Sequence, residues 1–337
     1  GDYSLYWFEN GALHGLAIAH HGAPSHLVSV ASGMMAMEKQ HTVNLVRDTA
    51  KLYGEGPFIG SVTSTLKRKE LAKNRFGSKE KAHGIVLGAN RLVTLGMTDL
   101  SCSVFVGITN GKATYDGPFV EKLLKSNRND FSCGGLARQN FMGFRDMDAS
   151  INASLLISSG RIRWHRETAR GCLYDSKMND FALQLGADID HEFYRYGYFE
   201  LGCFAGMNYD SIGQNGFSEK SPNTAPSSCV SISSMRHNFF AFDLGISVKT
   251  AKITNVELNG KLGFHCAALR KHGTATTLIF GTENEAAIHY GSKNCATISA
   301  GGSYEFKENW HCAFGLDGKF SSAFRAFSAS MSFGHRF

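Results

Sequence analysis

The chain has 337 residues, of which 43% are hydrophobic, 19% charged and 12% aromatic, and its formal net charge is +6. This composition is typical of an ordered protein with a core, and it excludes a disordered tail, a collagen-like chain and a dedicated nucleic-acid binder. No apolar run approaches the roughly 18 residues that a membrane-spanning helix requires. Because the chain begins with Gly1 and not with Met, we expect it to be part of a longer protein.

The first predicted element is a helix over residues 24–55. Ser25 follows Pro24 and is a suitable N-cap residue, and the run from Gly54 to Pro57 ends the helix. A helix of about 25 residues is about 38 Å long, because each residue adds about 1.5 Å. That length is enough to pass through a barrel whose hydrocarbon belt is about 25 Å tall. The helix residues expected inside such a lumen are Met34, Glu38, Asn44 and Arg47.

Alternation of apolar and polar residues with a period of two dominates residues 56–337, and it predicts twelve β-strands. The predicted strands are 58–67, 81–92, 99–111, 131–143, 149–165, 179–192, 197–209, 240–249, 255–268, 296–306, 310–317 and 327–337. At about 10 to 17 residues they are longer than ordinary globular strands, and a tilted strand needs about 9 to 11 residues to cross a bilayer. The alternation changes phase near Ser158 to Gly160, where we place a β-bulge.

The connections between these strands alternate between long and short. The long ones are 68–80, 112–130, 166–178, 210–238, 269–294 and 318–324, and the short ones are 92–98, 144–148, 193–196, 250–254 and 307–309. This alternation is typical of a membrane barrel with long loops outside and tight turns at the periplasmic end. Since a barrel must satisfy every backbone polar group in the bilayer, the strand at 58–67 is expected to pair with 325–337.

The two faces of the strands differ in chemistry, and we expect the apolar face to contact lipid and the polar face to line a wet lumen. The predicted lumen-facing charges are Asp188, Glu200, Asp243, Lys249, Glu257, Lys261, Glu305 and Asp317. We interpret them as a lattice of ion pairs around the helix, because no histidine stands at a fixed spacing that favours acid–base or metal chemistry. Glycine recurs on the same face, where it either leaves room for the helix or only lets the strands curve.

Motifs for catalysis and for cofactors are missing from the sequence. There is no P-loop, GxSxG, HExxH or dinucleotide-binding fingerprint, and no CxxC. We therefore expect neither catalytic residues nor a metal or cofactor, and we expect the eight cysteines to be isolated thiols. The segment from Lys67 to Lys81 has seven basic and two acidic residues. At an outer rim it would contact lipopolysaccharide phosphates, and the alternative is a solvated loop.

Several segments resemble the translocator domain of the autotransporters, the monomeric type V secretion proteins. Residues 56–60 (GPFIG) resemble the first strand of that family and residues 84–91 (GIVLGANR) its second. The C-terminal MSFGHRF, with Phe333 and Phe337, resembles the signal that the barrel assembly machinery recognises. Residues 3–11 resemble the end of a passenger domain, and a helix followed by twelve strands is the arrangement of this family.

The resemblance implies a 12-stranded antiparallel up-and-down β-barrel in a bacterial outer membrane, with the N-terminal helix through its lumen. It divides the chain into the end of a passenger and linker (1–23), the lumen helix (24–55) and the barrel (56–337). The implied function is export or anchoring of an N-terminal passenger at the cell surface. The implied partners are outer-membrane lipid, lipopolysaccharide, the assembly machinery and the passenger, with the barrel a monomer. Many members cleave themselves between paired Asn residues, whereas here Asn44 precedes Leu45.

Three alternatives remain open at the level of the sequence. A small porin requires an open lumen with residues 25–53 outside it. A barrel enzyme, such as an outer-membrane protease or lipase, requires catalytic side chains clustered at the outer rim. A soluble β-sandwich requires the apolar phase to lie in a dry protein interior.

Overall fold

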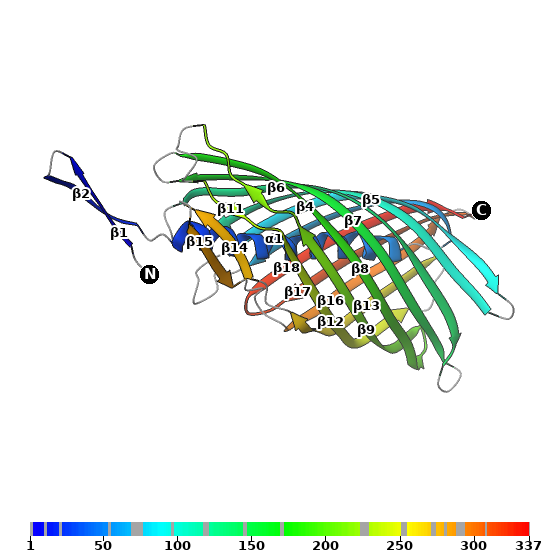
Figure 1. Ribbon diagram of the computed structural model, residues 1–337. Helices are drawn as coiled ribbons and strands as arrows, with labels where there is room; N and C mark the ends of the chain where they lie inside the picture. Colours follow the sequence, from blue (N-terminus) through cyan, green and yellow to red (C-terminus); the bar gives the residue numbers. More distant parts are fainter. Residues whose placement is uncertain are drawn as a thin grey trace.

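The computed structural model describes residues 3–9, 12–19, 22–52, 55–68, 77–95, 98–116, 121–143, 147–168, 172–222, 229–250, 255–270, 274–279, 282–287, 294–306 and 309–336. Twelve antiparallel strands form one closed barrel (Figure 1). They are β3 (Gly56–Arg68), β4 (Gly77–Leu95), β5 (Thr98–Asp116), β6 (Glu121–Met142), β7 (Asp148–Thr168), β8 (Leu173–Tyr196), β9 (Phe199–Gln214), β12 (Met235–Thr250), β13 (Val256–Arg270), β16 (Asn294–Phe306), β17 (Trp310–Phe320) and β18 (Phe324–His335). The predicted fold class is therefore confirmed.

The barrel closes through its first and last strands, as the sequence predicts. Strand β18 pairs with β3 from Phe324↔Arg68 to Gly334↔Phe58. Consecutive barrel strands pair everywhere else around the wall. Because the ring has no free edge, its strand N–H and C=O groups find partners within the wall, as a bilayer demands.

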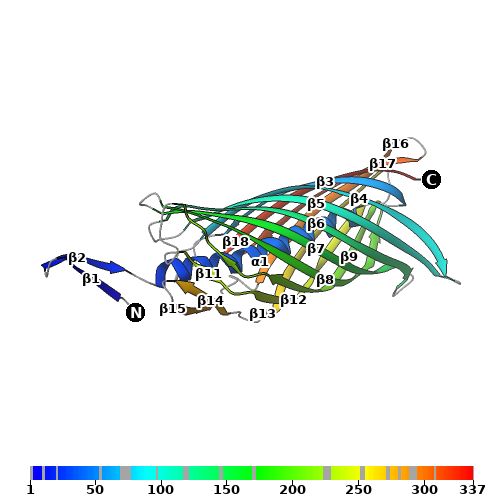
Figure 2. The ribbon, with the colours of Figure 1, turned by 45° about the horizontal axis from the view of Figure 1, so that its top comes forward.

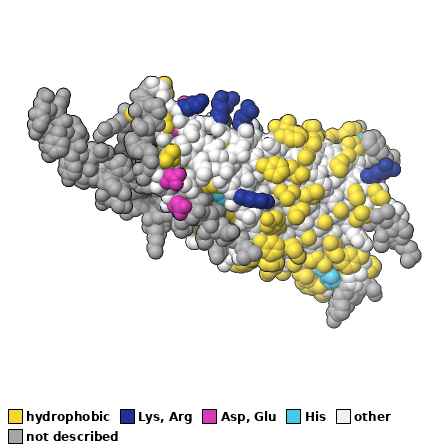
Figure 3. Space-filling view, in the orientation of Figure 1, with side chains coloured by type: hydrophobic (Ala, Val, Ile, Leu, Met, Phe, Trp, Pro, Cys, Tyr) yellow, Lys and Arg dark blue, Asp and Glu magenta, His cyan; other side chains and the backbone are white. Residues whose placement is uncertain are grey.

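The apolar phase of the strands faces outward. Phe264 is 44% exposed, Phe314 46% and Phe333 37%, so none of them lies in a dry interior. The apolar side chains gather in a belt over one part of the barrel (Figure 3). This arrangement contradicts a soluble β-sandwich and agrees with a wall whose outer face contacts lipid.

Strands β4 to β8 continue beyond this belt, and there their two faces exchange polarity. In β7, Ile157 points outward within the belt, whereas further along Arg161 and Arg163 are outward and Ile162 and Trp164 are buried inside. The pairing with β6 has no shift near residues 158–160. The predicted bulge at Ser158 to Gly160 is therefore wrong, because the apparent change of phase marks the point where the outer face leaves lipid and meets water.

Because of this reversal of polarity between the two faces, two of the predicted long connections are wrong. Strand β5 runs to Asp116 and β6 begins at Glu121, so most of 112–130 is strand. Strand β7 likewise runs to Thr168 and β8 begins at Leu173, within the predicted connection 166–178. The longest barrel strand, β8, has 24 residues, compared with the 10 to 17 or so expected.

The connections at 210–238 and 269–294 form a small sheet at one end of the barrel. It consists of β10 (Phe217–Ser218), β11 (Ser231–Ile232), β14 (Thr274–Ile279) and β15 (Thr282–Ala287) in that order. We call it the mouth sheet. Both β14 and β15 contact the helix of the chain (Figure 1), so the mouth sheet covers the end where the helix emerges.

The helix α1 (Gly22–Lys51) lies inside the barrel (Figure 2). It has 30 residues, or about 45 Å at the usual rise, and begins two residues before the predicted start and ends four before the predicted end at 55. It contacts eight barrel strands, β3 to β9 and β18. None of the described helical segments is long and apolar enough to cross a membrane.

Residues ahead of the helix form a separate hairpin. Strands β1 (Tyr3–Glu9) and β2 (Ala12–Ala19) pair antiparallel, with Tyr3 opposite Ala19. This two-stranded sheet is distinct from the barrel and from the mouth sheet. Its strands fall within residues 1–23, the segment that we expected to be the end of a passenger and its linker.

Candidate functional site

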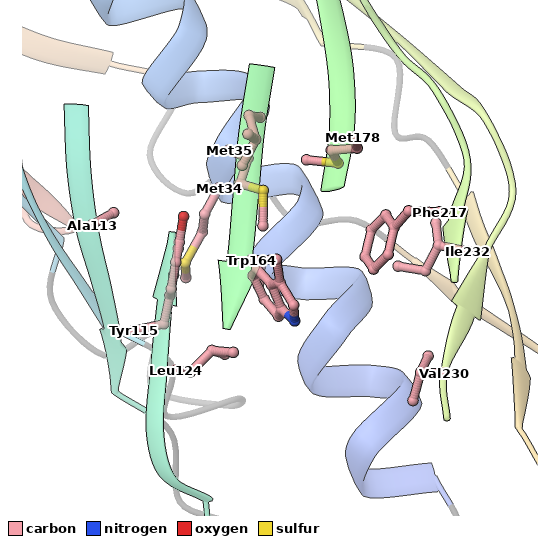
Figure 4. Close-up of a cluster of buried hydrophobic side chains, with 12 residues drawn as sticks. Met34, Met35, Ala113, Tyr115, Leu124, Trp164, Met178, Phe217, Val230 and Ile232 are labelled. Atoms are coloured by element: carbon pink, nitrogen blue, oxygen red, sulfur yellow. The ribbon is translucent and has the colours of Figure 1, made fainter. Parts of the chain in front are cut away.

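The lumen is the candidate site, because α1 makes its contacts there with the inner face of the wall. Around the first half of α1, buried apolar side chains form what we call the mouth cluster (Figure 4). It comprises Ala31, Met34, Met35, Ala113, Tyr115, Leu124, Ile162, Trp164, Met178, Phe217, Val230 and Ile232. The Tyr115 and Trp164 rings lie 5.7 Å apart, and the flexible methionine side chains of α1 fill the space beside them. The helix therefore leaves this end only if the cluster opens.

A buried ion cluster lies further along the helix. Lys39 Nζ stands 2.7 Å from Asp130 of β6 and 3.1 Å from Asp180 of β8, and all three side chains are at most 1% exposed. Arg128 Nη2 lies 3.4 Å from Asp180 and donates to the carbonyl oxygen of Met35 at 2.6 Å. Two cations therefore face two carboxylates, which is the balance that buried charges require.

Gly160 of β7 makes this cluster possible. A Cβ atom at this position would lie 2.0 Å from Asp130 Oδ1 and 2.3 Å from Asp180 Oδ1. Both carboxylates therefore occupy the space that any other residue's side chain would fill. The glycine brings the two acids together from strands on either side of β7, directly against Lys39.

Glu38 binds the wall beside this cluster. The Tyr115 hydroxyl donates to Glu38 Oε2 at 2.8 Å. Tyr115 lies beyond the apolar belt, near the end of β5 where Lys112 is the exposed outward residue. Burial raises the pKa of Tyr115 well above its usual value and the Glu38 carboxylate raises it further, so the phenol keeps the proton that it donates. Arg68 Nη1 donates to the carbonyl oxygen of Met34 at 3.2 Å.

The middle of the helix is held by amide and carboxylate groups. Gln40 donates to Asp210 Oδ2 at 2.6 Å, and Gln184 donates to the other oxygen of the same carboxylate at 2.6 Å. Gln184 Nε2 also donates to Asn44 Oδ1 at 2.9 Å. One carboxylate and one amide from the wall therefore connect two successive turns of α1 to β8 and β9.

At its C-terminal end the helix makes more exposed contacts. Arg47 donates to Asn208 Oδ1 at 2.5 Å and pairs with Asp48 at 2.9 Å. Lys51 pairs with Asp188, whose other oxygen accepts from Asn152 at 2.6 Å. Among the described residues, Asp188 is thus the predicted lumen charge that forms an ion pair with α1.

Glycines on the inner face bring α1 close to the wall. A Cβ at Gly60 would lie 2.8 Å from Thr49 Cγ2, and one at Gly107 would lie 2.8 Å from Val46 Cγ1. Both distances are shorter than real Cβ contacts allow. At these positions the glycines leave room for the helix, as one of the two interpretations of the sequence proposes.

Most of the other predicted lumen charges pair from strand to strand. Lys249 pairs with Glu192 at 2.9 Å, Lys261 with Asp190 at 2.7 Å, and Asp243 with His265 at 2.8 Å. Glu200 pairs with Arg195 at 2.9 Å. Glu200 and Lys249 also line a cavity of about 490 Å³ together with Asp148 and Asp190. Four of the predicted lumen charges therefore pair within the wall, whereas most of the contacts that hold the helix come from other residues.

The remaining predicted residues have these positions. Glu257 lies opposite Ser303 of β16, Asp317 opposite Ser299, and Glu305 opposite His311. Phe333 lies on the outer face, with its ring 5.1 Å from Trp310 and 5.5 Å from Phe306. Phe337 is outside the described residues.

Apart from Asp188, the wall carboxylates that bind α1 are ones that the sequence did not single out. Asp130, Asp180 and Asp210 each lie on the inward phase of a strand, but Asp130 and Asp210 fall just outside the predicted strands 131–143 and 197–209. Extending the first of these predicted strands by one residue at its start, and the second by one residue at its end, would have identified Asp130 and Asp210 as inward-facing.

The mouth sheet is tied to the wall by one buried carboxylate. Glu219 accepts from Arg166 Nε at 2.8 Å and from Arg166 Nη2 at 2.5 Å. It also accepts from Trp164 Nε1 at 3.3 Å and from the backbone N–H of Val230 at 3.0 Å.

Within the described part of the chain, no group of three or more His, Cys, Asp or Glu side chains is placed to hold a metal ion.

Comparison with known proteins identifies the architecture. The translocator domain of the autotransporter NalP from Neisseria meningitidis superposes with a TM-score of 0.68 at 15% identity, over 93% of this chain and 100% of that one. The transport unit of AIDA-I from Escherichia coli gives 0.62 at 9% identity, over 84% and 91%. The β-domain of the Bordetella autotransporter BrkA gives 0.57 at 9%, over 84% and 99%. These likenesses concern the fold.

The sequence itself gives the family. A search of curated protein sequences finds no match. The family model described as the autotransporter beta-domain matches residues 60–317, which is most of the barrel. The chain therefore belongs to the autotransporter β-domain family, the outer-membrane translocator barrels of type V secretion.

Proposed function

We propose that this barrel carries an N-terminal passenger to the cell surface and retains α1 as the tail of that passenger. The observation that supports this most directly is the path of the chain. It passes once through the lumen as α1, and β3 then begins the wall within five residues of its end. A chain threaded from one side to the other and then held has this topology.

The orientation follows from the same path. The hairpin of β1 and β2 precedes α1 at the end covered by the mouth sheet (Figure 1). The longest connections of the barrel, from β9 to β12 and from β13 to β16, lie at this end and contain the mouth sheet, and long connections face the exterior in outer-membrane barrels. The mouth-sheet end therefore faces the outside, and the opposite end, with the C-terminus, faces the periplasm.

The contacts of α1 support retention after export. Lys39, Glu38 and Gln40 are bound by groups from four strands, β5, β6, β8 and β9. Pulling the helix out would leave Asp130 and Asp180 without their lysine. Separating a buried pair costs about 3–5 kcal/mol, so the helix acts as a plug that stays in place.

Surface display tests the export function. An epitope-tagged domain with a secretory signal is fused ahead of Gly1 and produced in a Gram-negative host. We expect the epitope to be cleaved by protease added to intact cells. The same fusion without residues 56–337 is the control and should be protected. Protection of the epitope on the full fusion, while the barrel is folded, would overturn the proposal.

Conductance distinguishes the translocator from a small porin. In a planar bilayer, the full chain should conduct weakly, because α1 fills the lumen. Deletion of residues 1–53 should raise the single-channel conductance severalfold. A full chain that conducts as well as the deletion variant would support the porin and contradict a plug.

A further inference from the structure

The outer wall carries basic side chains in rows just beyond the apolar belt. Arg325 of β18 lies directly opposite Lys67 of β3, which lies opposite Lys79 of β4. Two residues nearer the belt, Lys81 of β4 lies opposite Lys112 of β5. All five side chains are exposed. We call these five residues the basic rows.

Like charges in such positions require a counter-charge. Side chains directly opposite on antiparallel strands are about 5 Å apart, and equal charges there destabilise the sheet. In the described part of the structure, no carboxylate pairs with any of the five. Arg68, from the same basic segment, instead points inward to Met34. The basic rows are therefore a surface that lacks its anion.

Below the basic rows the same strands become first polar and then apolar. The next row holds Thr63, His83 and Asn110, each opposite its neighbour, and the one after it holds Ser61, Ile85 and Ile108. The small side chains of Ser61 and Thr63 on β3 lie among larger neighbours. These two residues form the floor of a groove of about 710 Å³, which is also lined by Leu87, Val106, Phe131 and Met331.

We propose that the basic rows and this groove bind one lipid A headgroup of lipopolysaccharide, with its phosphates on the basic rows and acyl chains in the groove. Along the wall the cations come first, then hydroxyl and amide side chains, and then apolar side chains. In the same order, these groups suit the phosphates, the sugars and the acyl chains of lipid A. The basic rows span four strands, or about 14 Å at about 4.8 Å per strand. That width suits two phosphates on one headgroup better than the single phosphate of a phospholipid. The proposal rests on the orientation given above, which places the groove in the outer leaflet.

Binding of labelled lipopolysaccharide to the purified full chain in detergent tests the proposal. The variant Lys79→Gln/Lys81→Gln removes two charges from the basic rows and should weaken binding about 30-fold. The control variant Lys220→Gln/Arg236→Gln removes two exposed charges from β12 and the segment before β11. It should change lipopolysaccharide binding less than about twofold. Heat-modifiable gel mobility shows that each variant is folded. Equal binding by the wild type and the first variant would overturn the proposal.

Two further arms identify the ligand. Thr63→Phe fills the groove, so it should weaken lipopolysaccharide binding while the basic rows are intact. Phosphatidylglycerol micelles and inorganic phosphate should compete poorly. Competition by either as effective as that of unlabelled lipopolysaccharide would overturn the assignment to lipid A. Because the readout is lipid binding, its failure is distinguishable from failure of passenger display, which is measured on cells.

Discussion

Glycines on the inner face of the wall make room for three kinds of neighbour. At Gly60 and Gly107 the neighbour is α1, and at Gly160 it is a pair of carboxylates. At Gly88 and Gly134 the neighbour is an aromatic ring, because a Cβ there would lie 2.6 Å from Phe58 and 2.7 Å from Phe105. Room for the helix and strand curvature are both predictable from glycine on the inward phase. Rings lying over glycines are not, since they depend on which residues face each other across strands.

Gly160→Ala tests the buried ion cluster. The added methyl group must displace Asp130 and Asp180 from Lys39, which we expect to cost about 3 kcal/mol. The gain from replacing a strand glycine, about 0.5–1 kcal/mol, is smaller. The temperature at which the folded gel band disappears should therefore fall. Gly213→Ala is the control, because nothing lies within 4 Å of a Cβ there, and it should keep or raise that temperature. Equal behaviour of the two variants would contradict this account.

Two lysines of α1 distinguish buried from accessible ion pairs. Lys39 is 0% exposed beside Asp130, whereas Lys51 is 30% exposed beside Asp188. Lys39→Met leaves two buried carboxylates facing one arginine and should destabilise by about 3–5 kcal/mol. Lys51→Met should cost about 0–1 kcal/mol, since water screens that pair. Denaturant titration of the refolded barrel measures both, and the Lys39 variant proving no less stable would refute the assignment.

At the scale of elements, the number and pairing of strands follow from the sequence, but their length does not. Alternation with a period of two identifies a strand wherever one face meets lipid and the other meets water. Beyond Gly160 in β7 and before Phe131 in β6, the outer residues are polar and the inner ones pack on α1. The inner environment there is created by the helix, so these stretches looked like loops. Local sequence does not contain that information.

The mouth sheet is expected to keep the outer end of α1 covered. Glu219→Gln removes the negative charge that pairs with the buried Arg166 guanidinium, and breaking this buried ion pair should cost about 3–5 kcal/mol. The β10–β11 segment should loosen, and limited proteolysis of the folded barrel should then cut near Val230. Glu285→Gln alters an exposed carboxylate of the same sheet and serves as the matched control. Unchanged protection in the Glu219 variant would show that this contact does not anchor the sheet.

At the scale of the whole molecule, the barrel and its threaded helix were predictable, but most partners of the helix were not. Met34, Glu38, Asn44 and Arg47 all contact the wall. Of the eight predicted lumen charges, Asp188 meets the helix. Alternation within a strand predicts which of its residues face the lumen. Whether such a residue contacts α1 also depends on its height along the barrel axis. Height is set by strand tilt and register, which alternation does not reveal.

The C-terminal strand is proposed to be the segment that the assembly machinery recognises. The Phe333 ring packs at a tilt against Trp310 on the outer face. Phe333→Ala should reduce the amount of folded barrel in cells, while the protein that does assemble keeps nearly wild-type stability. Phe327→Ala, at an outward residue of the same strand that is 51% exposed, should assemble normally. Heat-modifiable mobility of membrane fractions gives both yields, and equal yields would contradict a role for Phe333 in recognition.

The helix α1 lies in the lumen (Figure 2), and the proposed function requires it to stay there while the passenger is outside. A Cβ at Gly107 would lie 3.6 Å from Val46 Cβ, a separation that suits a disulfide. In cells displaying the passenger, Val46→Cys/Gly107→Cys should therefore give a peptide cross-linked between residues 46 and 107 under mild oxidation, detected by mass spectrometry. Val46→Cys/Ile108→Cys, whose second thiol faces outward, should not. Absence of the first cross-link in folded, displaying barrels would contradict the account.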